Sequence, residues 1–325
     1  MRWLKGIQDP IQTCFYALGT VNTIKLYRKN TEHVLGLAMK EVYEIDDKMS
    51  IFKEDSEISR FNYLATGVAQ KVSKDTYFVI KEAVKYSKVT ARAMDITIKP
   101  LVDLWRTHTE AFEIPDNDEI KEALKLVNIN DLKLDDKEYS VMKKNEKQAI
   151  DLGSIAKGYA ADQVRKILLN HHIKNAIINL GGNVIVMGND PARKPWKVGV
   201  QNPDKEQGVS MGILTLRDKS VVTSGGYERY TVINNKKYHH ILDPKTGFPP
   251  TSDIKSVTIV ADNSINAEGL STGIFVMGLI EAINVLKLNT SVDGVIITES
   301  NKVFITRGII KKFALIDDSF TLEVI

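Results

Sequence analysis

The hydrophobic period of this sequence changes near residue 170, and this change constrains the fold more than any other feature. Before it, apolar residues recur every three or four positions. This pattern predicts four helices: one over about 32–49, one that begins after a Ser73 cap, one from an Asp116 cap to near Val127, and one around Val164. After it, alternating or short apolar runs predict strands at 176–180, 184–187, 196–201, 211–217, 220–223, 229–234 and 255–261. Consecutive strands with segregated helices favour an α+β fold with mostly antiparallel sheets over a doubly wound sheet.

The last third of the chain predicts one more helix and two strand pairs. The helix covers roughly 266–287, and the strand pairs turn at Ser300-Asn301 and near Asp317-Asp318. The Lys- and Asp-rich stretch 131–147 is predicted to be a hairpin or loop on the surface. Since no repeat, low-complexity tract or convincing linker divides the sequence, we expect one compact unit over residues 15–325, preceded by an N-terminal extension, residues 1–14.

Composition argues against several classes of function. The net charge is only +3, and the lysines are scattered among acids, which argues against nucleic-acid binding. The single cysteine, Cys14, excludes an internal disulfide and a cysteine-based zinc site. No window approaches the length of a membrane span, and the positively charged start lacks the apolar region of a signal peptide. We therefore expect a cytoplasmic protein, or an extracytoplasmic one if a leader has been removed from this sequence.

The segment Asp151-Leu-Gly-Ser-Ile-Ala-Lys-Gly158 carries the strongest chemical signal. It ends a polar loop, places two glycines around Lys157, and leads into a helical pattern. Glycines let a backbone approach a ligand, and the first amides of a helix attract anions, so the segment fits a phosphate-binding loop. A glycine-punctuated helix start is the alternative. The residue order argues against a Walker A loop, because Tyr159 follows the second glycine where that loop needs Lys and then Ser or Thr.

Four further segments carry residues able to do chemistry. Asp95 and Thr97 precede Pro100 in an extended run, where Asp95 is expected to cap. Gly181-Gly182 ends a strand, either as a tight turn or as a close approach to a ligand. Of the adjacent pair His239 and His240, at most one can face a site. The stretch from Asp243 to Gly247 is predicted to be a turn by its residue types. Glu268 and Thr272 share one face of a helix, where they form either a capping or surface pair or a cation site.

One set of short motifs argues for a different enzyme class. Ser154-Ile-Ala-Lys157, Lys245-Thr-Gly247 and Ser264-Ile-Asn266 have the residue types of the serine β-lactamase signatures. In that class the Ser-x-Asn element lies between the other two, whereas in this chain it comes last. Tripeptide patterns of this kind arise by chance in a chain this long, so an acyl-enzyme mechanism is disfavoured.

In this order, the segments resemble the ApbE-like FAD:protein FMN transferases through nearly the whole chain. The matching motifs are Leu18-Gly-Thr20, Ser50-Ile-Phe52, Met94-Asp-Ile-Thr97, Asp151 to Gly158, Gly181-Gly182, Thr223-Ser-Gly225, Tyr227-Glu-Arg229, His240 to Gly247 and Leu270-Ser-Thr272. The resemblance implies a T-fold-like α+β architecture. It also implies a Mg²⁺-dependent enzyme that moves FMN from FAD onto a Thr or Ser hydroxyl of an acceptor flavoprotein and releases AMP.

The resemblance also implies roles for particular residues. His240 is expected to be the base that takes the proton from the acceptor hydroxyl. The implied metal ligands are Ser154 and Ser271 through their carbonyls, with Glu268 and Thr272. The implied FAD contacts are Leu18, Phe52, Ala93, Met94, Asp95, Asp151, Lys157 and Leu242.

Three positions depart from the family pattern. Glu268 stands where Asp is usual, which moves the carboxylate outward by one methylene, while Leu18 and Phe52 replace a common Met and Tyr. We interpret the chain as a divergent active member, with an altered or inactive relative as the alternative. An FAD pyrophosphatase that gives FMN and AMP, and a non-catalytic FAD-binding protein, remain as rival functions.

Overall fold

The computed structural model describes residues 10–325. The helices are α1 (Glu32–Met49), α2 (Glu57–Tyr63), α3 (Lys74–Val89), α4 (Lys99–Glu110), α5 (Asn117–Leu124), α6 (Ala156–Asn170), α7 (Ser264–Met277) and α8 (Leu279–Leu288), with 3₁₀ turns at Ile96–Ile98, Ile129–Asp131 and Arg307–Ile309. No helix in this described range is both long and apolar enough to cross a bilayer.

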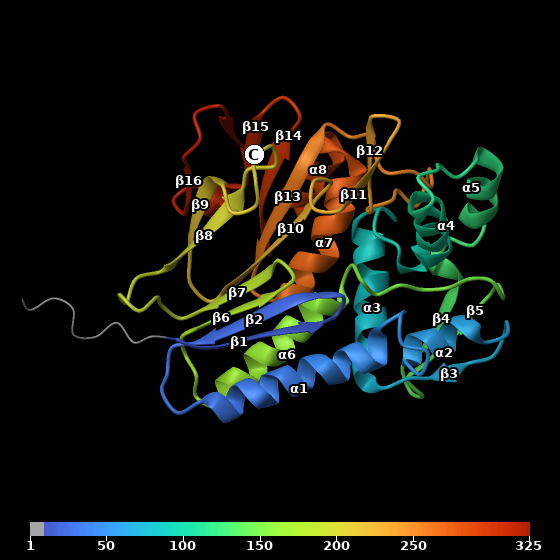
Figure 1. The fold of residues 1–325 in the computed structure, drawn as a ribbon, viewed down its shortest axis with the longest axis horizontal. Coiled ribbons are helices and arrows are strands. Elements are labelled where there is room, and N and C mark those ends of the chain that lie inside the picture. Colours follow the sequence, from blue (N-terminus) through green and yellow to red (C-terminus); the bar gives the residue numbers. More distant parts are fainter. Residues whose placement is uncertain (1–9) are drawn as a thin grey trace, which may run out of the picture.

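A nine-stranded sheet forms the centre of the molecule, in the order β1-β2-β6-β7-β10-β13-β14-β15-β17 (Figure 1). Its strands are β1 (Ile11–Ala17), β2 (Thr20–Leu26), β6 (Ala176–Leu180), β7 (Asn183–Met187), β10 (Lys219–Gly225), β13 (Ile254–Ala261), β14 (Asp293–Thr298), β15 (Lys302–Ile305) and β17 (Thr321–Val324). Among the strand pairs of residues 10–325, only β15–β17 is parallel, so the expected α+β fold with mostly antiparallel sheets is confirmed.

Three smaller sheets complete the structure. They are β16-β9-β8, β3-β5-β4 and the two-stranded ribbon β11-β12. Their strands are β3 (Gln70–Lys71), β4 (Leu132–Asp135), β5 (Ser140–Lys143), β8 (Trp196–Gln201), β9 (Ser210–Leu216), β11 (Tyr230–Ile233), β12 (Lys236–His239) and β16 (Phe313–Leu315). The β4–β5 pair is the hairpin predicted within residues 131–147.

The two faces of the central sheet build two separate apolar cores. In β14, Ile296 packs with the helices, whereas Val295 and Ile297 pack with the β16-β9-β8 sheet. This division follows from the period of two in a strand, which sends successive side chains to opposite faces. A third, smaller core lies between α4, α5 and the loop after β12, around Trp105. The Trp105 Nε1–H donates to the Gly247 carbonyl at 2.7 Å and ties this loop to α4.

Helix α7 is the inner helix and carries the residues that matter most for the site. It packs on α3, α6, β10 and β13, and eleven of its fourteen residues are buried. Close approach to α3 depends on small residues, because a Cβ on Gly269 would lie 2.3 Å from the Tyr86 ring and one on Gly273 would lie 2.5 Å from Thr90. The helix is therefore fixed on all sides, and so are the polar groups it presents.

Local signals predicted most of the elements correctly. The Ser73 side chain caps α3 by accepting the Thr76 N–H, and Asp116 forms a capping box with Glu119 at the start of α5. The strand expectations from 176 to 261 agree with the structure to within two residues at each end. Helix α5 ends at Leu124, three residues before the predicted Val127.

Four expectations need correction. The predicted helix over 266–287 is two helices, because Gly278 has φ 83° and interrupts it. Segments β16 and β17 do not pair with each other; they join β9 and β15. The run before Pro100 is a 3₁₀ turn capped by Asp95 and followed by α4, not an extended segment. Residues 1–9 of the expected extension lie outside the described residues, and residues 11–14 belong to β1.

Candidate active site

The loop before α6 is held to the neighbouring segment by backbone and side-chain bonds. The Asp151 N–H donates to the Ile96 carbonyl at 2.8 Å, and the Asp151 Oδ1 accepts the Gly153 N–H at 2.8 Å. Burial raises the pKa of the Asp151 carboxyl, although the Gly153 N–H and the charges of Lys99 and Lys157 oppose this. Asp151 is thus a fixed acceptor at the entry to the helix.

Glu268 reaches from α7 to the first turn of α6. Its side chain is nearly buried, its Oε2 accepts the Gly158 N–H at 2.5 Å, and its Oε1 forms an ion pair with the Lys157 Nζ. Lys157 also donates to the Gly153 carbonyl at 2.7 Å. A carboxylate from another helix therefore caps α6, whose own N-cap residue, Ile155, supplies no side-chain bond. The expected free anion site at this helix start is already occupied by Glu268.

The two helices cap each other. Near the middle of α6, the Asp162 carboxylate accepts the N–H groups of Ser264 and Ile265 at 2.8 and 2.9 Å, and these are the first residues of α7. Burial raises the pKa of Asp162, and the Glu268 charge acts in the same direction. This reciprocal arrangement fixes how far α7 lies along α6 and therefore where Glu268 points.

Gly158 serves helix packing rather than ligand approach. A Cβ at this position would lie 2.6 Å from the Ser264 carbonyl oxygen and 2.8 Å from the Ile265 Cα. The glycine therefore allows α6 and α7 to touch through their backbones. Gly153, the other glycine of the motif, is exposed, and a Cβ there would meet only the Asp151 carboxylate, at 3.1 Å.

The oxygen atoms around Glu268 suit a hard cation. Because the Gly158 N–H is directed to Glu268, it does not bond the Ser154 carbonyl four residues before it, and no other backbone N–H of residues 10–325 donates to that oxygen. Thr272 Oγ1 lies 3.3 Å from Ser224 Oγ, which donates to Ser271 Oγ at 2.9 Å. One carboxylate, hydroxyls and a free carbonyl are ligand types that Mg²⁺ accepts. The Lys157 ammonium pairs with the same carboxylate, so a cation would have to share or replace that contact.

The two adjacent histidines differ in their surroundings. The His240 Nδ1 lies 3.1 Å from the Arg229 carbonyl, so the neutral ring carries its proton on Nδ1 and leaves Nε2 as an acceptor. Desolvation lowers the pKa of His240, and the charges of Arg229 and Lys157 add to this effect. His239 packs edge-on against the Phe275 ring, and burial lowers its pKa to about 4. His239 is therefore part of the packing, whereas the charges that act on His240 come from Arg229 and Lys157.

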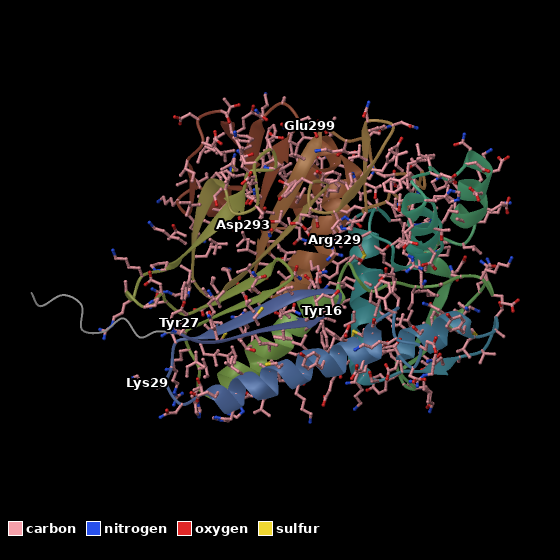
Figure 2. All side chains as sticks on the ribbon, viewed as in Figure 1. Tyr16, Tyr27, Lys29, Arg229, Asp293 and Glu299 are labelled. Atoms are coloured by element: carbon pink, nitrogen blue, oxygen red, sulfur yellow. The ribbon has the colours of Figure 1, made fainter. Side chains whose placement is uncertain are left out.

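Arg229 connects this region with the first hairpin of the central sheet. Its Nη2–H donates to the Gly19 carbonyl at 3.4 Å, in the turn where Leu18 and Gly19 both have positive φ. Figure 2 shows Arg229 beside the hairpin strand that carries Tyr16. Ser224 and Arg229 were not predicted as site residues, although the motifs Thr223-Ser-Gly225 and Tyr227-Glu-Arg229 contain them.

The other expected FAD contacts are spread over several surroundings. Ala93 and Met94 are buried, and the Asp95 carboxylate accepts from Thr97 and from the Ile129 N–H. These three can offer a ligand only backbone atoms. Leu242 belongs to the small core around Trp105. By contrast, Phe52 is 72% exposed, with the Arg106 guanidinium 6.0 Å from its ring centre.

An open cavity of about 710 Å³ lies beyond His240, between the following loop and the end of α7. Its lining includes Asp243, Phe248 and Met277. The volume is in the range of small-molecule pockets. Glu268 and Lys157 are not among its lining residues.

Comparison with known proteins gives one consistent result. The sequence profile of the ApbE family matches residues 18–296. An FAD:protein FMN transferase of Klebsiella pneumoniae is 30% identical over 303 residues, which are 93% of this chain and 94% of the relative. A protein of the same name from Haemophilus influenzae is 34% identical and covers 82% of this chain and 78% of its own length.

Solved structures agree with the sequence comparisons. The ApbE protein of Thermotoga maritima superposes with a TM-score of 0.83 at 33% identity, over 91% of this chain and 96% of its own. The flavin transferase ApbE of Vibrio cholerae superposes with a TM-score of 0.79 at 26% identity, over 96% of this chain and 98% of its own. The similarity therefore includes the sheet, the helix pair α6–α7 and the loops between them.

Proposed function

This chain belongs to the ApbE family, and on that premise we propose that it is an FAD:protein FMN transferase. The reaction joins the FMN half of FAD to a hydroxyl of an acceptor protein and releases AMP. For this chain we propose a Thr or Ser acceptor, a Mg²⁺ requirement, and a site built around Lys157, Glu268 and His240.

The observation that carries the proposal is the position of Lys157. Its ammonium group pairs with Glu268, and its charge acts on His240 and lowers the pKa of that ring. A cation and a carboxylate from distant parts of the sequence thus meet at the start of α6, and the His240 imidazole lies within the range of the Lys157 charge. Transfer from a pyrophosphate needs this combination, because the protein must hold charged oxygens in place and remove one proton.

The proton transfer can be assigned to particular atoms. The Arg229 carbonyl holds the His240 Nδ1–H, so Nε2 is free to take the proton of the acceptor hydroxyl. The hydroxyl oxygen then forms a bond to the FMN phosphorus, and the bond from that phosphorus to the AMP oxygen breaks. The proton on Nε2 is returned to AMP or to solvent. Because His240 has a lowered pKa, the ring is neutral and ready to accept at neutral pH.

The metal proposal rests on the oxygen groups already described. Glu268, Thr272 and the carbonyl of Ser154 would hold the ion, with the Ser271 carbonyl as a fourth candidate. Ser271 lies inside α7, where a carbonyl is already engaged by the helix, so it is the weakest of the four. Bound Mg²⁺ would neutralise negative charge on the pyrophosphate. Lys157 would then be released from Glu268 and be available to a phosphate oxygen.

The remaining FAD contacts are proposals of the same kind. Asp151 presents a fixed carboxylate at the helix start, and the Leu18 turn reaches the same region through Arg229. Phe52 offers an exposed ring to the flavin or adenine, whereas Ala93, Met94 and Asp95 offer backbone atoms. Leu242 would act through the loop that follows His240.

The proposal is tested by incubating this protein with FAD, Mg²⁺ and an acceptor flavoprotein from the organism of one of the relatives. Flavin fluorescence that stays with the acceptor after denaturing electrophoresis supports transfer. Free FMN and AMP with an unlabelled acceptor would show a pyrophosphatase instead. Intact FAD that remains bound would show a binding protein. A chelator should abolish the transfer, and Mg²⁺ should restore it.

A further inference from the structure

The β11–β12 ribbon, which ends at His239 directly before His240, has two free edges. Among residues 10–325, the two strands pair only with each other, and Figure 1 shows the ribbon between α7 and the α4–α5 pair. Unpaired strand edges in natural proteins are commonly covered, shortened or used for binding. The two edges of this ribbon are therefore candidates for a binding surface.

The register shows which backbone groups point outward. The His240 N–H donates to the Arg229 carbonyl, so the hydrogen-bonded pairs alternate from there towards the turn. The pairs Tyr230–His239 and Val232–Lys237 are consequently the non-bonded ones, whose N–H and C=O groups point to the edges. In β11 these groups belong to Tyr230 and Val232, and nothing in the described part of the chain bonds them.

The two faces of the ribbon are also different. Tyr238 packs against the Trp105 ring at 5.6 Å between centroids, which attaches one face to α4. The opposite face carries Tyr230 and Val232, which are 45% and 49% exposed, and at its inner end His239, the partner of Tyr230, packs against Phe275 of α7. The Lys237 Nζ lies 4.6 Å from the centre of the Tyr230 ring on this outer face. The ribbon thus presents an apolar strip with cations around it.

The position of His240 distinguishes the two edges. Its Nδ1 lies 3.1 Å from the Arg229 carbonyl, so the ring leans from the end of β12 towards the β11 side. A strand added to β11 would lie about 4.8 Å from it, next to Arg229 and on the side to which the His240 ring leans. A strand added to β12 would lie on the far side of the ribbon from the leaning ring.

We propose that the free edge of β11 binds an extended, acidic segment of the acceptor protein as a third strand and presents its hydroxyl to His240. The backbone groups of Tyr230 and Val232 would supply the strand bonds. Within residues 228–240, the exposed cations Arg229, Lys236 and Lys237 outnumber the single acid, Glu228, and favour acidic residues beside the target Thr or Ser. This inference rests on the proposed transfer function and adds how the acceptor is recognised.

A matched pair of proline substitutions tests the edge. Val232→Pro removes an N–H that points out from β11, and Lys237→Pro removes the equivalent N–H of its cross-strand neighbour on β12. Each leaves the bonds within the ribbon in place. Lys237→Gln separates the effect of charge from that of the backbone. Transfer to an acceptor flavoprotein, FAD affinity and FAD hydrolysis are measured for each variant.

We expect Val232→Pro to lower kcat/KM for the acceptor about tenfold, with FAD affinity and hydrolysis unchanged. Lys237→Pro should match Lys237→Gln, and both should weaken transfer to threonine peptides with acidic flanks more than to those with basic flanks. Equal losses for the two prolines, no loss for Val232→Pro, or a preference for basic flanks would overturn the inference. A wild-type enzyme that flavinylates the folded acceptor but no peptide would also overturn it. A wild-type enzyme that modifies neither would instead refute the transfer function itself.

Discussion

Alanine substitutions at two helical glycines should change stability in opposite directions. Gly158 lies against α7, where a Cβ would meet the Ser264 carbonyl oxygen at 2.6 Å, whereas a Cβ on Gly36 in α1 meets nothing within 4 Å. Both substitutions gain helix propensity, worth about 1 kcal/mol. Only Gly158→Ala forces two backbones apart.

The size of the effect follows from the contacts that must shift. Overpacking against fixed backbone costs about 1–3 kcal/mol, and weakening the Glu268 cap on the Gly158 N–H costs about 1 kcal/mol more. After the gain in propensity, Gly158→Ala should lower the free energy of unfolding by about 1–3 kcal/mol. Gly36→Ala should raise it by about 0.5–1 kcal/mol.

Urea unfolding followed by circular dichroism measures both variants against the wild type. Gly158→Ala should also lose transfer activity under conditions where it is folded, because Glu268 moves with α7, while Gly36→Ala should keep full activity. A Gly158→Ala protein as stable as Gly36→Ala would refute the close helix contact. It would also remove the physical reason for a glycine after Lys157.

Three further predictions concern the polar groups of the site. Glu268→Gln keeps an oxygen for the Gly158 N–H but removes the charge beside Lys157, so Mg²⁺-dependent transfer by the folded variant should fall at least about 100-fold. Undiminished transfer would exclude Glu268 from the metal site. His240→Asn should lower kcat about 10²–10⁴-fold. Because the pKa of His240 is lowered, the wild-type rate should fall on acidification only below the ordinary histidine pKa of about 6.5, and a fall that begins above that pH contradicts His240 as the base. The half-buried His239 has a folded-state pKa of about 4, so the unfolded chain binds more protons between about pH 6.5 and 4. Stability should therefore decline as the pH falls through this window, by up to about 1.4 kcal/mol per pH unit. His239→Gln should remove that slope, and an unchanged slope assigns it to other groups.

The sequence predicted those elements whose signals are local. Ser73 and Asp116 are followed by helical periodicity and do cap α3 and α5, because a cap needs only the next three residues. Strand pairing between distant segments is not a local property. Segment β17 pairs in parallel with β15, and no turn signal near Asp317 could have predicted that partner.

In the site, too, features with local sequence signals were predictable, and those that depend on packing were not. A lysine between glycines at a helix start was visible in the sequence, but the capping of that helix by Glu268 depends on how α7 packs. Gly158 fitted a ligand loop by its spacing, and the structure gives it a helix contact because Ser264 lies against it. The ordered set of motifs predicted the family, since its specificity lies in the combination rather than in any one segment.

The yields of AMP and of flavin-labelled acceptor in one reaction test the proposed transfer at its chemical step. Purified protein is incubated with FAD, Mg²⁺ and an acceptor flavoprotein, and both products are quantified over time. We predict one AMP released for each acceptor that gains covalent flavin, with both products formed at least about 100-fold more slowly by Glu268→Gln. AMP released together with free FMN while the acceptor stays unmodified would contradict FMN transfer by this chain.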